Sequence, residues 1–185
     1  MPTKEEYKEN LINTVIEKSE ANNWEEAVKE WDIVDVEENL DCAGQCTCGK
    51  EGLRYLFTIK NRINNNIIYP IGSSCISKFD VDKLKDEAKL KEDLFKLLHA
   101  VENNEYITIS SDLFSRKLLE YLYNIGAFVP NKYNDFESYN DYKFLLDMFN
   151  KRKRSEKQEK KSSAIIINSI IPFLRDLLEN RIKAH

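Results

Sequence analysis

Glycine, proline and histidine are scarce in this sequence, which contains five, four and two of them among 185 residues. The shortage of glycine and proline, beside 32% charged residues, excludes a collagen-like or low-complexity chain and indicates a helix-rich protein. No glycine-rich phosphate loop and no serine nucleophile motif is present. The histidines are His99 and His185, and a lone histidine is more often a surface or satisfied core residue than a ligand. Histidine-based catalysis therefore has little support.

The sequence also lacks a long apolar segment. Its longest apolar run, Ala164 to Ile167, is far shorter than the roughly 20 residues that a membrane span needs. The stretch from Met1 to Asn10 is charged and has no apolar centre, so it does not form a secretory signal. We therefore expect a soluble, cytoplasmic protein with reduced thiols and no membrane partner.

Negative charge is concentrated at one end of the chain. Residues 1–41 contain four Lys and thirteen Asp or Glu, a net charge of −9, whereas residues 42–185 contain 24 basic and 19 acidic residues, a net charge of +5. A protein that grips duplex nucleic acid through its phosphates is normally basic over most of its surface. Any contact with nucleic acid is therefore expected to be local.

The four cysteines fall within 34 positions, which indicates one shared site. Zinc takes four soft ligands in a tetrahedron, and the turn from Cys46 to Gly49 can present two thiolates to one ion. A disulfide between Cys46 and Cys48 would close a small, strained ring. A cysteine cluster that is merely buried or redox active is the alternative. Four cysteines make a closed centre without a position for water, so we expect the zinc to be structural.

A β-hairpin is predicted between Cys48 and Cys75. Residues 53–60 are rich in aromatic and β-branched side chains, residues 61–66 contain four asparagines suited to a turn, and residues 67–71 form a second strand. The hairpin leads into Gly72-Ser73-Ser74-Cys75. We expect Ser73 to cap a helix that carries Cys75 in its first turn, where the helix dipole favours a thiolate.

This order of cysteine turn, hairpin and late cysteine resembles a treble-clef zinc finger. Residues 41–79 also resemble a zinc module that recurs in phage and mobile-element proteins; the matching residues are Cys46, Cys48, Gly49, Asn61, Ile71, Gly72, Cys75 and Phe79. The resemblance implies bound zinc and a binding role. A treble clef usually takes two ligands from its helix, whereas this helix offers only Cys75. Cys42 is therefore predicted as the fourth ligand.

The rest of the chain predicts mostly helices. The expected helices are at about 4–21, 23–30, 81–103, 112–125, 139–150 and 156–183. A Thr3–Glu6 capping box opens the first helix, Ser110 or Ser111 caps the fourth, and Pro172 should bend the last. A short strand is expected at 32–38, and a strand or extended link at 106–109. The fold class is α+β and mostly helical, with a small zinc-bound hairpin module packed with a helical body. The expected parts are acidic N-terminal helices (1–31), the hairpin module (32–80) and a helical domain (81–185), in one compact body with a possible seam near residue 80.

Several features allow two interpretations. Trp24 and Trp31 have the spacing of a buried helix face, although a base-stacking or partner-anchoring surface is the alternative. The acidic residues of 32–38 fit a solvated edge better than a catalytic or metal-binding carboxylate set. The helices after residue 112 are weak candidates for a DNA-reading helix-turn-helix, because the turn is long and the following helix is not basic.

The function that these patterns favour is a non-enzymatic, zinc-stabilised binding protein of phage or mobile-element type, acting on nucleic acid or on a nucleic-acid-handling machine. The segment 151–161 holds seven positive and two negative charges, and an ordinary solvated helix start is its other interpretation. Candidate contacts to nucleic acid or to an acidic partner are Arg54, Lys60, Arg62, Lys151, Arg152, Lys153 and Arg154. The alternative function is an acidic antagonist of a host defence nuclease, similar to an anti-CRISPR inhibitor; an enzyme is a third possibility.

Overall fold

The computed structural model describes residues 2–110 and 112–183, with side chains as far as residue 180. The chain divides into two compact units, unit 1 ending at Lys91 and unit 2 beginning at Glu92. The boundary lies inside the long helix α4 (Asp82–Glu102). Helices predominate, and the described strands form one three-stranded antiparallel sheet, so the predicted α+β, mostly helical fold class is confirmed.

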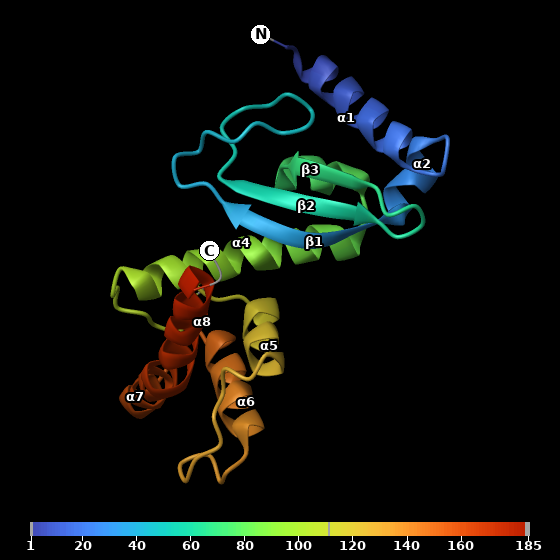
Figure 1. The fold of residues 1–185 in the computed structure, drawn as a ribbon. Coiled ribbons are helices and arrows are strands. Elements are labelled where there is room, and N and C mark those ends of the chain that lie inside the picture. The colour runs from blue at the N-terminus through green and yellow to red at the C-terminus, as the bar shows by residue number, and fades with distance from the viewer. Residues whose placement is uncertain (1, 111, 184–185) are drawn as a thin grey trace. The chain divides into compact units, whose positions relative to one another are not determined.

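Unit 1 builds a small sheet between short helices (Figure 1). Its elements are α1 (Lys4–Lys18), α2 (Trp24–Ala27), the 3₁₀ turn η1 (Val28–Glu30), β1 (Trp31–Glu38), β2 (Tyr55–Asn61), β3 (Ile67–Ile71), α3 (Ser73–Ile76), the 3₁₀ turn η2 (Ser77–Phe79) and the first part of α4. The predicted capping box opens α1: the Thr3 side chain accepts the Glu6 N–H, and the Glu6 carboxylate accepts the Thr3 N–H. This pairing satisfies two donors that a helix start leaves free.

The sheet has the order β1-β2-β3, which leaves β1 at an edge (Figure 1). Val36 pairs with Phe57, and Phe57 pairs with Ile71, so the predicted hairpin of β2 and β3 is present. The register of β1 shifts between Ile33 and Asp35, and the extra residue, Val34, is exposed. The acidic residues of β1 are exposed or partly exposed, and charge along an edge strand discourages pairing with another chain.

Both tryptophans pack within unit 1, but Trp24 begins α2 and Trp31 begins β1, so they do not share the helix face that their spacing predicts. Trp31 is 2% exposed, and its indole N–H donates to the Ser19 hydroxyl at 3.0 Å. Burying a side chain of this size stabilises the fold by about 3 kcal/mol. Trp24 is partly buried and meets Phe79 edge to face, with ring centroids 5.5 Å apart. The interpretation of both tryptophans as core residues therefore fits their surroundings.

Unit 2 is helical throughout its described elements. They are the rest of α4, α5 (Arg116–Asn124), α6 (Ser138–Phe149), α7 (Glu156–Ile165), the π-helical segment η3 (Ile166–Ile170) and α8 (Ile171–Lys183). A long loop, residues 125–137, joins α5 to α6, whereas a helix-turn-helix uses about three or four residues. Apolar side chains of α5, α6, η3 and α8, such as Leu119, Leu145 and Ile170, are fully buried and form the interior.

Two predicted features of unit 2 differ in the structure. Helix α5 begins at Arg116, and its cap is Ser115, whose hydroxyl accepts the Leu118 N–H at 3.1 Å; Ser110 does not cap it, and Ser111 lies outside the described residues. The Ser110 carbonyl instead accepts the Phe114 N–H, which makes a separate turn before the helix. Of the two forms predicted for residues 106–109, the strand is not formed, and the residues lie in an irregular link between α4 and α5.

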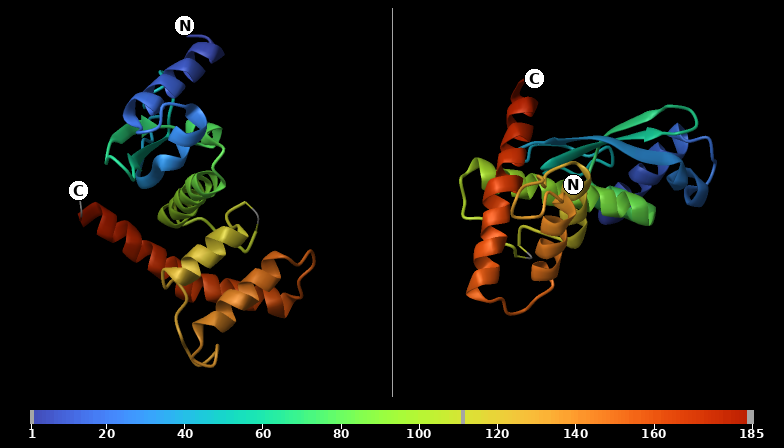
Figure 2. Two further views of the ribbon diagram at one scale, coloured as in Figure 1. Left: turned by 90° about the vertical axis from the view of Figure 1, so that its right-hand side faces the viewer. Right: turned by 90° about the horizontal axis from the view of Figure 1, so that it is seen from below.

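Helices α7 and α8 run on as one rod through η3 (Figure 2, orange to red). The predicted Ser155–Gln158 capping box opens α7. Proline lacks an N–H and its ring collides with the carbonyl four residues earlier, so Pro172 cannot continue an ordinary helical ladder. The sequence predicts a bend at this proline. The structure accommodates it with π-helical turns directly before it, a wider winding that relieves the collision.

Candidate metal centre

Three cysteine sulfurs meet inside unit 1. Cys46 and Cys48 come from the loop between β1 and β2, and Cys75 comes from α3. The three Sγ atoms all lie within 4.8 Å of one another, with 3.7 Å between Cys46 and Cys75 and 3.5 Å between Cys75 and Cys48. A tetrahedral zinc with bonds of about 2.3 Å separates its sulfurs by about 3.8 Å. The three cysteines therefore lie close enough to hold one metal ion.

Burial and hydrogen bonding set the charge of this group. Each of the three side chains is at most 3% exposed. Hydrogen bonding from the Cys75 thiol, together with the Gly72 N–H at 3.4 Å, lowers the pKa of Cys46 to about 5. The same contact with Cys46 raises the pKa of Cys75. One thiolate is thus stabilised and a second is repelled, and a bound cation would remove that repulsion.

The turn that carries Cys46 and Cys48 is fastened by its backbone. The Gly49 N–H donates to the Cys46 carbonyl at 2.7 Å. Gly49 has a φ of +98°, a backbone conformation that residues other than glycine rarely adopt. The Thr47 N–H and hydroxyl both donate to the Pro70 carbonyl at 2.8 Å. The end of β3 therefore holds the cysteine turn beside the start of α3.

Helix α1 and the segment that precedes β2 pack around the glycines of the cysteine site. The Asn10 side-chain amide donates to the Cys48 carbonyl at 3.2 Å. A Cβ atom on Gly49 would stand 3.6 Å from the Tyr7 ring, and one on Gly72 would stand 2.9 Å from Leu53 Cδ2. The two glycines of the sequence pattern therefore serve different needs, positive φ at Gly49 and close packing at Gly72.

The predicted cap at Ser73 is wrong. The cap position of α3 is Gly72, it makes no side-chain hydrogen bond, and Ser73 is already the first helical residue. The Cys75 N–H donates to the Gly72 carbonyl at 2.9 Å, so backbone contacts around Gly72 hold Cys75 in place. Helix α3 spans only Ser73–Ile76, which is too short for its dipole to contribute much.

Cys42 lies away from this group. Its side chain is exposed, its φ is +50°, and its Sγ lies 3.8 Å from the Leu40 carbonyl. Gly44, which lies between Cys42 and Cys46 in the sequence, pairs with Leu53. Among the described residues, no histidine, aspartate or glutamate joins the three cysteines either. The structure thus brings together three of the four predicted ligands; His99 lies in α4, and His185 is outside the described residues.

Glu30 and Asn61 form a buried polar pair at the end of the sheet where β1 begins and β2 ends. The Glu30 carboxylate is held by three donors, the Glu20 N–H (2.9 Å), the Ala21 N–H (2.8 Å) and the Asn61 side-chain amide (2.5 Å). The Asn61 side-chain oxygen in turn accepts backbone N–H groups of the hairpin turn. Sequence reasoning noted Asn61 within a motif and missed Glu30, since nothing in the local pattern separates it from the exposed glutamates nearby.

The predicted basic contacts on the hairpin are largely engaged within unit 1. Arg54 pairs with Glu38 at 2.9 Å and lies over the Tyr55 ring. Arg62 lies 3.5 Å from Asp32 and also donates to the Lys29 carbonyl. Lys60 is partly buried in β2. The acidic edge strand therefore neutralises much of the positive charge that the sequence offered here.

The basic run of unit 2 is more open. Arg154 pairs with Glu159 at 2.6 Å and donates to the Met148 carbonyl, so it ties α7 to the end of α6. Lys151 donates to Gln158 at 3.1 Å. Arg152 and Lys153 are exposed and have no partner among the described residues. Two of the four predicted contacts in this run are thus available without breaking an interaction.

Comparison of the chain with protein-family models, with curated proteins and with solved structures gives no match. Within the described part of the chain, no helix combines the length and apolar character needed to cross a membrane. The features of the chain that bear on function are the cysteine group of unit 1 and the charged surfaces of both units.

Proposed function

We propose that this chain is a non-enzymatic, zinc-stabilised binding protein that acts on nucleic acid or on a nucleic-acid-handling machine. The observation that carries the proposal is the buried group of Cys46, Cys48 and Cys75. Thiolates select zinc over harder ions such as magnesium or calcium, and a structural zinc supplies folding energy to a small module. The resemblance of residues 41–79 to a treble-clef-like zinc module of phage and mobile-element proteins supports the same metal.

The metal's role is structural in this proposal. A catalytic zinc needs a position open to water and usually a carboxylate or histidine that moves protons. The three cysteines are almost fully buried, and no such group joins them among the described residues. Three protein thiolates leave a fourth coordination position on the zinc, but the burial of all three side chains keeps solvent away from it.

Nucleic-acid contact is assigned to the basic run. Arg152 and Lys153 are exposed, and Lys157, Lys160 and Lys161 on α7 extend the positive surface, where Glu156 pairs with Lys160. Contacts of this kind bind phosphates without reading sequence, and their affinity falls with salt because counterions are released. The hairpin arginines contribute less, since their acidic partners would have to be displaced.

Fluorescence anisotropy with labelled single- and double-stranded oligonucleotides tests this assignment. Two phosphate contacts predict a fall in affinity on the order of tenfold between 50 and 200 mM salt. Arg152→Glu with Lys153→Glu is expected to abolish the binding, whereas Lys83→Glu, a reversal at an exposed lysine of unit 1, leaves it unchanged. Absence of binding at low salt, or equal binding by both variants, contradicts the assignment.

The second candidate function is an acidic antagonist of a host defence nuclease. The observation in its favour is the edge strand β1, which presents the exposed side chains of Asp35 and Glu37, together with the exposed Glu25 and Glu26 of α2. Such a surface imitates the phosphates that a nuclease channel binds. Cleavage of DNA by an RNA-guided nuclease should slow in its presence, and Glu25→Lys with Glu37→Lys should restore it. Undiminished cleavage at excess protein removes this candidate.

A further inference from the structure

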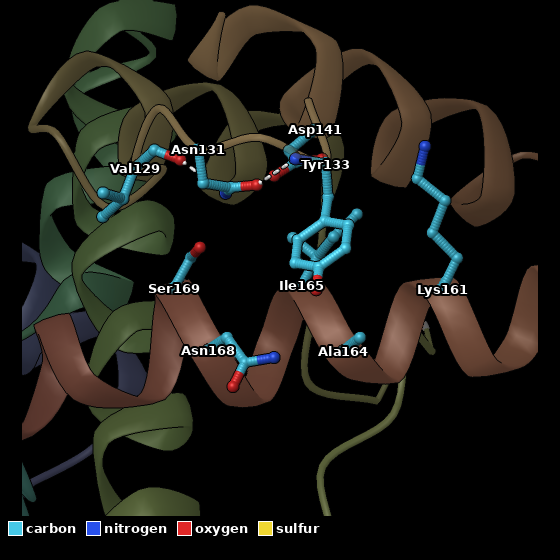
Figure 3. Close-up of a pocket in the computed structure, with 9 residues that line it drawn as sticks. All are labelled: Val129, Asn131, Tyr133, Asp141, Lys161, Ala164, Ile165, Asn168 and Ser169. Atoms are coloured by element: carbon cyan, nitrogen blue, oxygen red, sulfur yellow. Dashed lines mark hydrogen bonds between the residues drawn. The ribbon is translucent and has the colours of Figure 1, made fainter. Parts of the chain in front are cut away.

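Unit 2 contains a cavity of about 730 Å³ between the α5–α6 loop and the α7–η3 rod (Figure 3). Val129 and Tyr133 line it from the loop, and Asp141 lines it from α6. Lys161, Ile165 and Ser169 line it from the rod. Its volume lies within the range of about 300–1,000 Å³ that small-molecule sites occupy. The cavity is unrelated to the cysteine group, which belongs to unit 1.

Two buried polar groups lining this cavity lack full hydrogen bonding. Asp141 is 4% exposed, and its one hydrogen bond among the described residues joins Oδ2 to the Asn134 side-chain amide at 2.8 Å. Ser169 is also 4% exposed, and its hydroxyl has no partner in the described part of the chain. Among the described residues only the Ser162 hydroxyl is both unpaired and sealed from solvent, so the free oxygens of Asp141 and Ser169 are reachable from the cavity that they line and can hydrogen-bond to a ligand there. In Figure 3 the Ser169 hydroxyl points from the rod toward the loop wall.

The chemistry of the walls selects the ligand. Asp141 needs N–H or O–H donors, which either an organic cation or a neutral donor edge can provide. The segment that ends at Lys161 carries seven positive and two negative charges, so it repels a cation and attracts an anion. A ligand with both an N–H donor edge and a negative group satisfies both conditions. The apolar floor of Ile165 and the exposed ring of Tyr133 suit a flat heteroaromatic body.

We propose that this cavity binds a guanine nucleotide, either free or as an unpaired residue of a nucleic-acid strand. Guanine presents two adjacent donors, N1–H and the 2-amino group, which match one carboxylate, whereas adenine and cytosine present a single amino group on that edge. Asp141 accepts these donors, Tyr133 stacks on the base, and Lys161 pairs with the phosphate. Only the strand-bound form rests on the proposed nucleic-acid function.

Isothermal titration with GMP, IMP, AMP and inorganic phosphate tests the inference, with amide shifts of residues 129–133 and 161–169 as the site readout. GMP is expected to bind saturably, IMP about tenfold more weakly because it lacks the 2-amino group, and AMP and phosphate without saturation. Ala164→Trp, at an exposed position lining the cavity, should abolish GMP binding without disturbing the fold.

Asp141→Asn should lower the affinity for GMP at least tenfold. The matched control Asp147→Asn changes an exposed position on the same helix and should leave that affinity unchanged. Circular dichroism establishes that each variant is folded. Equal binding of GMP and AMP, or wild-type binding by Ala164→Trp, overturns the proposal even if Asp141→Asn is unfolded.

The oligonucleotides UUGUU and UUAUU separate the two sources of guanine. If the protein binds UUGUU more tightly than UUAUU, and Ala164→Trp removes this difference, the cavity binds guanine as part of a strand. GMP binding without oligonucleotide binding assigns it to a free nucleotide and contradicts the nucleic-acid form of the proposed function. A third outcome is that oligonucleotides bind through Arg152 and Lys153 but show no guanine preference, and that GMP does not bind. This outcome contradicts the cavity proposal, and the proposed function stands.

Discussion

Replacing Glu30 by glutamine should destabilise unit 1 strongly, although the two side chains have nearly the same shape. The Glu30 side chain is 7% exposed and receives three N–H donors. Glutamine offers one acceptor oxygen and turns an NH₂ group toward at least one of those donors. A hydrogen bond to a charged group contributes about 1.5–3 kcal/mol. We therefore expect Glu30→Gln to lower the free energy of unfolding by about 2–4 kcal/mol.

The same pair makes stability depend on pH. Burial by itself raises the pKa of Glu30, but the hydrogen bonds from Asn61, Glu20 and Ala21 outweigh it, and the pKa lies below its ordinary value. A lowered folded-state pKa gives stability that is present above the unfolded pKa of about 4.3 and is lost as pH falls through the folded value. Glu30→Gln should remove this part of the acid sensitivity.

Tryptophan fluorescence during urea unfolding is the assay, because both tryptophans of the chain, Trp24 and Trp31, lie in unit 1. The matched control is Glu26→Gln, an exposed glutamate paired with Lys29, for which a change of at most about 0.5 kcal/mol is expected. A Glu30→Gln variant as stable as this control, or with unchanged acid sensitivity, would refute the reasoning.

Three further outcomes follow from the site. Gly49→Ala should cost about 1–2 kcal/mol of stability and weaken metal binding, since its φ is +98°, whereas Gly52→Ala, with a φ of +83° and open space around it, should cost similar stability and leave metal binding unchanged; chelator competition separates the two. Arg54→Ala should change nucleic-acid affinity by less than about threefold in the anisotropy assay, because Glu38 already engages it, and a larger loss contradicts that. Cys42→Ser should keep the cobalt–thiolate absorption of a cobalt-loaded protein, and loss of a quarter of that absorption would assign Cys42 to the metal.

Local chemistry explains what the sequence predicted correctly. Capping boxes at Thr3 and Ser155 and the apolar periodicity of α4 depend on residues within a few positions of one another. The grouping of Cys46, Cys48 and Cys75 was predictable because the turn and the hairpin determine it through short-range geometry. These features need no knowledge of how distant segments pack.

Long-range packing explains what the sequence did not reveal. Nothing local distinguishes Glu30 from Glu26, yet a backbone turn and Asn61 make one buried and the other exposed. Cys42 lies outside the group of the other three cysteines, and the loop between them is folded by a pairing of Gly44 with Leu53 that no local pattern reveals. The engagement of Arg54 by Glu38 likewise follows from strand register, which the charges alone do not specify.

Metal content is the most direct measure of the central claim that three buried thiolates hold a structural zinc. The protein is purified without added metal, dialysed against a mild chelator and measured by plasma mass spectrometry. The unmodified protein and Cys42→Ser should each contain about one zinc per chain. Cys48→Ser should contain none and should lose the cooperative fluorescence transition of unit 1. Absence of zinc from the unmodified protein, or a full equivalent retained by Cys48→Ser, would contradict the account.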